Sequence, residues 1–149
     1  MRTMTKTLAA LLLVTAGCAT NANIAETHRE DVAARSRLLA IAARNLDDAM
    51  RSRTAPAEQE ASGLVAKFHT ESQHFASAAG RWVTTDNVNE RYEGLIDAWV
   101  KVKDAFATLK LDTMTAQTWQ RVTYEWEKLS RATGYGGNAY EKKSGEKKK

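Results

Sequence analysis

The sequence predicts an all-α protein, an up-down-up-down antiparallel four-helix bundle that follows an N-terminal signal segment. Apolar residues recur at spacings of three and four in four successive stretches between residues 24 and 133, which is the period of amphipathic helices. No stretch alternates between apolar and polar residues as a strand would. The 149 residues include a single proline, and proline is disfavoured inside helices. This length favours one domain.

The first two helices are predicted over residues 24–53 and 57–81. Pro56 lies in the opening turn of the second helix, where a missing N–H costs nothing. The first apolar stripe contains Val32, Ser36, Leu39, Ala43, Leu46 and Met50, widened by Leu38 and Ile41. The second contains Ala61, Val65, Phe68, Ser72, Phe75, Ala79 and Trp82.

The last two helices are predicted over residues 87–110 and 114–133. Between the second and third helices, Gly80 and then Thr84, Thr85, Asp86 and Asn87 supply cap residues, and Asn87 with Glu90 three residues later resembles a capping box. Asp112 caps the fourth helix and Gly134 ends it. Links this short between long helices make neighbouring helices antiparallel.

Residues 1–17 form the predicted signal segment. Arg2 and Lys6 precede an apolar run, residues 8–16, that is short for a membrane span. The next residues, Thr15-Ala16-Gly17-Cys18, resemble the lipobox of bacterial lipoprotein precursors. This resemblance implies that Cys18, the only cysteine, becomes the acylated first residue. Other interpretations are an ordinary signal peptide cleaved nearby and a free buried thiol.

The lipobox resemblance also predicts where the protein resides. Ala19, in a position where Asp would retain a lipoprotein in the inner membrane, implies the periplasmic face of the Gram-negative outer membrane. Residues 18–23 are a short tether, so the first helix begins within about 20 Å of the bilayer. An even number of antiparallel helices returns the chain to that same end.

The basic charge of the chain lies at its two ends. The formal net charge is +4, but two of the 22 basic residues lie in the signal segment and five in residues 141–149, leaving a nearly neutral body. A structured basic face for nucleic acid is therefore not expected. Residues 134–149 are predicted to be a disordered Gly/Lys-rich tail, whose lysines are Lys142, Lys143, Lys147, Lys148 and Lys149. The tail is either a solvated end, a contact for anionic lipid head groups, or a contact with peptidoglycan, since Lys149 is similar to the terminal lysine of the murein lipoprotein.

No catalytic, metal or cofactor site is predicted. Glu71 and His74 have the Glu-x-x-His spacing of ferritin-like di-iron bundles, but only one copy is present and His74 points outward. His28 and His69 lie beside the apolar stripes, and the glycines after residue 133 follow a helix where a phosphate loop would precede one. An enzyme is therefore not expected.

Aromatic residues are the unusual feature of the predicted bundle. Eight lie on inward positions: Phe68, Phe75, Trp82, Tyr92, Trp99, Phe106, Trp119 and Trp126. They predict a core in which Ser72, Thr115 and Thr118 are candidate acceptors for buried indole N–H groups. The alternative is an apolar cavity beside the alanine-rich first helix, holding a lipid or similar small molecule. The charged residues of the first helix predict a solvated, salt-bridged face or a surface for a protein partner.

The sequence therefore predicts an exported, lipid-anchored cell-envelope protein. Its non-catalytic helical bundle would serve protein interaction or structure, with the membrane as one partner through the lipid anchor and an envelope protein as another. The alternative is a carrier or sensor that binds an apolar ligand inside the bundle.

Overall fold

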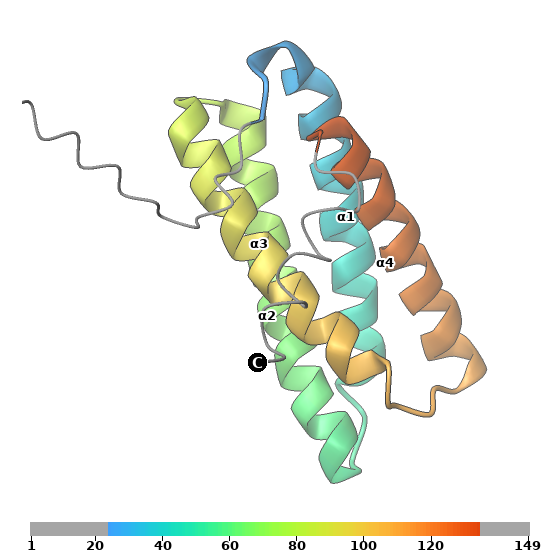
Figure 1. Cartoon of the computed structure of the whole chain (residues 1–149). Coiled ribbons are helices and arrows are strands. Elements are labelled where there is room, and N and C mark those ends of the chain that lie inside the picture. The colour runs from blue at the N-terminus through green and yellow to red at the C-terminus, as the bar shows by residue number, and fades with distance from the viewer. Residues whose placement is uncertain (1–23, 135–149) are drawn as a thin grey trace, which may run out of the picture.

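Four helices make up almost all of residues 24–134, the part of the chain that the computed structural model describes (Figure 1). A 3-10 turn, η1 (Glu26–His28), leads into α1 (Arg29–Met50), which is followed by α2 (Pro56–Arg81), α3 (Thr85–Phe106) and α4 (Thr113–Ala132). The predicted all-α four-helix bundle is confirmed. The predicted signal segment and tether, and the tail beyond Gly134, lie outside the described residues.

The helices pack as two pairs joined through α1 and α2. α1 packs closely against α2 and α4, and α2 against α3. In Figure 1, α2 and α3 form one side of the bundle and α1 and α4 the other. Although α3 and α4 are consecutive in the chain, few of their Cα atoms approach within 8 Å. Large side chains must therefore fill the space between these two helices.

The starts of the helices follow from their capping residues. Pro56 begins α2 after an extended Ala55 (ψ 140°), the conformation that a following proline favours. The Asp112 carboxylate accepts a hydrogen bond from the Thr115 amide at 3.0 Å, as predicted for the N-cap of α4. Of the predicted cap residues before α3, Thr84 is the N-cap, because its hydroxyl accepts the Asn87 amide at 3.2 Å. The helix therefore begins earlier than predicted, and the capping box at Asn87 is wrong.

α2 ends at Arg81, as predicted, but its C-cap is not a glycine. Gly80 lies within the helix, and Trp82 adopts the left-handed C-cap conformation with φ 42° and ψ 58°. A left-handed backbone is strained for a residue with a Cβ. Burial of the Trp82 ring and an indole N–H bond to the Thr85 hydroxyl at 3.4 Å hold it there. Tertiary packing thus overrides the local preference for glycine.

Two predicted helices are too long. The first begins at Arg29, after the η1 turn, and before that turn the amide of Ile24 donates to Asn89 on α3 at 3.0 Å. It ends at Met50, and residues 51–55 form the link to Pro56. The third ends at Phe106, after which Leu109 and Leu111 pack against the core from a non-helical link.

Most buried apolar residues follow the predicted stripes. Val32, Leu39 and Leu46 of α1 are fully buried. Leu38 and Ile41, predicted to widen that stripe, are instead 40% and 59% exposed. Both lie on the side of α1 turned away from its neighbours, because α1 is covered by α2 and α4 only over the narrower stripe.

Candidate functional site

A connected set of aromatic rings fills the interior between α2, α3 and α4. Seven of the eight predicted rings belong to it, in the order Phe75, Tyr92, Trp126, Trp99, Trp119 and Phe106, with Phe68 branching from Trp99. We call this set the aromatic ladder. The eighth ring, Trp82, lies at the C-cap of α2. The sequence therefore identified the members of the cluster, and the fold brings them together.

Trp99 on α3 is the centre of the aromatic ladder. Its ring stacks on Trp126 with centroids 4.7 Å apart and planes at 15°, and on Trp119 at 5.3 Å and 23°. On its other side it meets Phe68 of α2 at 5.8 Å in a tilted arrangement. Offset stacking and tilted contacts are the favourable geometries for aromatic pairs. One side chain thus joins three helices.

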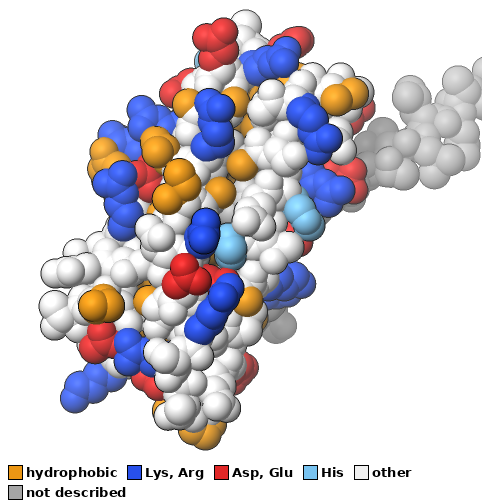
Figure 2. All heavy atoms as spheres, turned by 180° about the vertical axis from the view of Figure 1, so that it is seen from behind, with side chains coloured by type: hydrophobic (Ala, Val, Ile, Leu, Met, Phe, Trp, Pro, Cys, Tyr) orange, Lys and Arg blue, Asp and Glu red, His pale blue; other side chains and the backbone are white. Residues whose placement is uncertain are grey.

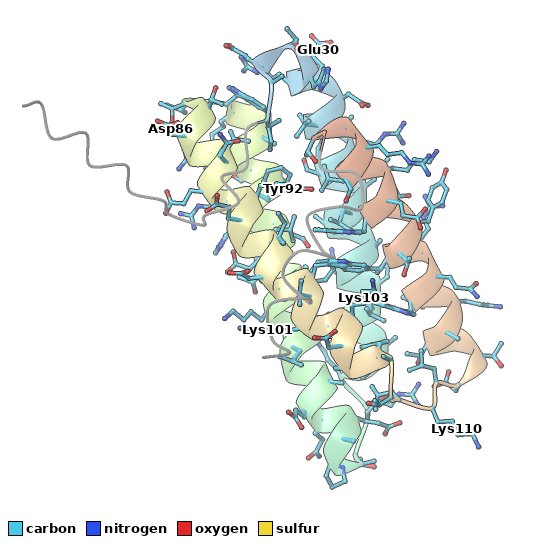
Figure 3. The ribbon with its side chains drawn as sticks, viewed as in Figure 1. Glu30, Asp86, Tyr92, Lys101, Lys103 and Lys110 are labelled. Carbon is cyan, nitrogen blue, oxygen red and sulfur yellow. The ribbon has the colours of Figure 1, made fainter. Side chains whose placement is uncertain are left out.

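The ladder forms the seam between α3 and α4. Tyr92 and Trp99 of α3 both contact Trp126 of α4, and Phe106 contacts Trp119 at 4.5 Å. Figure 3 shows Tyr92 pointing into the bundle, while Asp86 and Lys101 project from the outside of α3. Trp119 and Trp126 are half-buried. The contact between α3 and α4 is therefore made by aromatic side chains, and the two backbones do not approach closely.

Hydroxyl groups bond near the ladder in a pattern that differs from the prediction. Ser72 donates to the Phe68 carbonyl at 2.8 Å, and Thr118 donates to the Met114 carbonyl at 2.9 Å. Both bonds stay within one helix, as is usual for helical serine and threonine. The Thr133 hydroxyl donates to the Tyr92 hydroxyl at 2.9 Å, which ties the end of α4 to α3.

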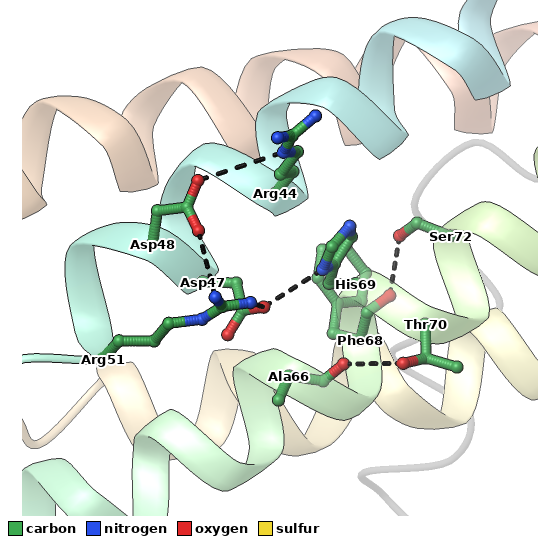
Figure 4. A network of polar contacts seen from close by, with 9 residues as sticks. All are labelled: Arg44, Asp47, Asp48, Arg51, Ala66, Phe68, His69, Thr70 and Ser72. Carbon is green, nitrogen blue, oxygen red and sulfur yellow. Dashed lines mark hydrogen bonds and ion pairs between the residues drawn. The ribbon is translucent and has the colours of Figure 1, made fainter.

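A buried polar network joins α1 to α2 (Figure 4). Asp47 is only 4% exposed, although its sequence position suggested a solvated face. Its carboxylate accepts from Arg51 at 3.0 Å and faces Nδ1 of His69 at 3.1 Å. Nε2 of His69 is buried without a hydrogen-bond partner among the described residues. The carboxylate also raises the pKa of Arg51 through its hydrogen bond and its charge.

A second buried carboxylate lies on α4. Glu125 is 1% exposed, and its Oε1 pairs with the guanidinium of Arg121 at 2.6 Å. Its Oε2 has no partner within the described part of the chain. A buried charge with a single partner is costly, so this pair restricts how α4 packs. The period of the sequence gave no signal of either buried carboxylate, since both lie at the edge of an apolar stripe.

Arg53, Asp112 and Thr115 join the link between α1 and α2 to the start of α4. Arg53 donates to both Asp112 and Thr115, and the Thr115 hydroxyl donates to Asp112 at 3.0 Å. Hydrogen bonds from the Thr115 amide and hydroxyl, with the Arg53 charge, lower the pKa of Asp112 to about 2. Thr115 is therefore a structural hydroxyl that fixes the start of α4.

The remaining histidines form no metal centre. His74 lies on the surface 4.0 Å from Glu71, as its register predicted, and His28 faces the Ala132 carbonyl at 3.2 Å. Within residues 24–134, no three His, Cys, Asp or Glu side chains lie close enough to hold a metal ion. The predicted lipidation site Cys18 and the lysines of the tail lie outside the described residues.

Comparison with known proteins gives no relative. No family model, no curated protein and no solved structure matches the chain. Among the helices of the described region, none is both long and apolar enough to cross a membrane.

Proposed function

We propose that this chain is an exported, lipid-anchored cell-envelope protein whose non-catalytic bundle has a structural or protein-interaction role. The observation that carries the proposal is the position of Cys18, the only cysteine, directly after a basic and apolar leader and two small residues. Two or three acyl chains at this residue would anchor the protein durably. The anchored surface is that of the periplasmic face of the outer membrane.

The interior of the bundle supports a structural or binding role. Its buried polar groups serve packing: Asp47 bonds Arg51 at the end of α1 and faces His69 of α2, and Thr133 bonds Tyr92 across α3 and α4. The rings of the ladder stack on one another in the interior of the bundle. These are the interactions of a rigid helical scaffold.

Localisation is tested by replacing Cys18 with alanine. We expect the wild-type chain to sediment with membranes and to incorporate labelled palmitate, and the Cys18→Ala variant to do neither. Thr20→Ala is the matched control and should behave as the wild type. Membrane retention of Cys18→Ala without palmitate would refute the lipid anchor.

One observation favours a second function, the binding of an apolar ligand. Because rings and not close backbones hold α3 against α4, a flat apolar molecule could replace stacking partners at the half-buried Trp119 and Trp126. Native mass spectrometry of the full chain, extracted from membranes, separates the two functions. A mass equal to the lipidated chain alone supports the scaffold, and a retained ligand that is lost in Trp126→Ala supports the carrier.

A further inference from the structure

The outward side of α1 and α4 combines exposed apolar groups with positive charge. Its apolar members are Leu38, Ile41 and Tyr124, which are among the few large apolar residues exposed in the described chain. Its cations are Arg37 and Arg44 from α1, and Arg121, Lys128 and Arg131 from α4. We call this surface the α1/α4 outer face. Figure 2 shows apolar and basic side chains intermingled on this side of the bundle.

The α4 half of this face is a single line of side chains. Residues 117, 121, 124, 128 and 131 recur at spacings of four and three, so they share the outward side of the helix. They comprise three cations, one tyrosine and one glutamine, and no carboxylate. The tyrosine, Tyr124, is 48% exposed.

Tyr124 is held between two of these cations. The Arg121 guanidinium lies 5.4 Å and the Lys128 ammonium 5.3 Å from the centre of its ring. Both distances are within the range of cation–π contacts. Arg121 is partly neutralised by the buried Glu125, whereas Lys128 and Arg131 form no ion pair within residues 24–134. Aromatic and basic side chains are both common where proteins meet the head-group layer of a bilayer.

The α1 half supplies the aliphatic groups. Ile41 is 59% exposed and Leu38 40% exposed, with Arg37 and Arg44 beside them. Arg44 pairs with Asp48 only at 4.0 Å, across two well-exposed side chains. Such a pair is weak in water and leaves the guanidinium able to bind other anions.

The opposite side of the bundle has the reverse charge. The outward line of α3 contains five acidic residues and one lysine: Asp86, Glu90, Glu93, Asp97, Asp104 and Lys101. α2 and α3 lie away from the α1/α4 outer face (Figure 1). The outward line of α4 is therefore basic and that of α3 acidic, so an anionic surface attracts the first and repels the second.

We propose that the α1/α4 outer face docks on an anionic phospholipid bilayer, with Ile41, Leu38 and Tyr124 at the head-group level and the cations on phosphate groups. This inference rests on the proposed lipid anchor, because only residues 19–23 separate Cys18 from Ile24, which keeps the start of the described chain within about 20 Å of the bilayer. The bundle then lies along the membrane. Charge complementarity and this short reach favour a lipid surface over a protein partner.

The experiment places a fluorescent probe on the face in the full, lipidated chain. Ile41→Cys receives an environment-sensitive fluorophore, and acylation leaves the introduced cysteine as the only free thiol. Lys67→Cys, exposed on α2, is the matched control. Each is reconstituted into phosphatidylcholine vesicles with and without phosphatidylglycerol. We expect a blue-shifted, brighter emission at position 41 with phosphatidylglycerol, and an unchanged emission at position 67.

Charge removal gives the quantitative arm of the experiment. Lys128→Gln with Arg131→Gln should lower the ratio of docked to undocked protein roughly fivefold for each cation removed at low salt. Lys67→Gln with Lys101→Gln, on the other side, should leave it unchanged. Equal emission at positions 41 and 67 in anionic vesicles overturns the proposal. So does cross-linking of position 41 to a protein in cells without any vesicle response.

The proposed lipid anchor and the proposed docking face can be refuted independently of each other. Flotation with pure phosphatidylcholine vesicles reports the anchor, since it needs no anionic lipid. If the chain does not float, the anchor is wrong, and the probe on a Cys18→Ser background with excess phosphatidylglycerol vesicles still decides whether the face binds. Unchanged emission there overturns the docking inference by itself.

Discussion

Replacement of Trp99 by alanine should destabilise the bundle more than any other ring truncation in the seam. Trp99 is 4% exposed and stacks on Trp119 and Trp126 while it contacts Phe68. Truncating a buried tryptophan costs about 3–5 kcal/mol, which combines lost burial with the cavity left behind. Since small domains are stable by about 5–15 kcal/mol, we expect a large fall in the free energy of unfolding.

Urea denaturation followed by circular dichroism at 222 nm measures this change. If the free energy of unfolding depends on urea concentration with the same slope in the wild type and the variant, a shift in the midpoint urea concentration reports a change in stability. Ile41→Ala is the control, because truncation of an exposed residue should change stability by less than about 0.5 kcal/mol. A loss below about 1 kcal/mol for Trp99→Ala would refute the conclusion that this ring joins three helices.

A double-mutant cycle isolates the ring contact itself. Trp99→Ala and Trp119→Ala remove one stacked pair, and such pairs contribute about 0.5–1.5 kcal/mol beyond burial. The cost of the double variant should therefore fall below the sum of the single costs by about that amount. Strict additivity would show that the 5.3 Å stacking contributes no energy of its own.

Three further predictions concern polar groups. Thr84→Ala removes the N-cap of α3 and should cost about 1 kcal/mol of stability in urea denaturation, whereas Thr84→Ser should retain most of it; equal stability of Thr84→Ala and wild type would contradict the cap. Asp47→Ala leaves Arg51 and His69 without their shared acceptor, and we expect a loss of about 1–3 kcal/mol, with Asp48→Ala as the exposed control; similar effects of the two variants would argue against the buried network. Because folding lowers the pKa of Asp112 to about 2, its ionised form stabilises the fold fully above its unfolded pKa near about 4, and this contribution is lost as pH falls through about 2. Between these two values the stability of wild type should therefore fall more steeply than that of Asp112→Asn, and parallel pH profiles would exclude this linkage.

The aromatic cluster shows which features of the core the helical period of the sequence predicts. Phe68, Phe75, Tyr92 and Trp99 fall on inward positions of the sequence pattern, and all four are buried. The pattern did not indicate that α3 and α4 would stand apart with rings between them. That separation depends on ring size at facing positions of two helices, which the period of either helix alone does not contain.

The exceptions to the pattern all arise from contacts, or missing contacts, between helices. Leu38 and Ile41 fit the apolar stripe of α1 but are exposed, because no neighbouring helix covers that side. Asp47 looks like a solvated carboxylate, yet it is buried because His69 of α2 meets it. Trp82 replaces a glycine as the left-handed cap because its ring is buried.

The sequence by itself determined the all-α class, the four helices and most of their buried faces, since period, proline and capping residues act locally. Only the tertiary structure decided which flank of each stripe is covered, how far α3 stands from α4, and which polar groups are buried. These depend on the contacts of residues distant in the chain. For the same reason, the exposed apolar and basic groups of α1 and α4 became one surface only when the helices packed side by side.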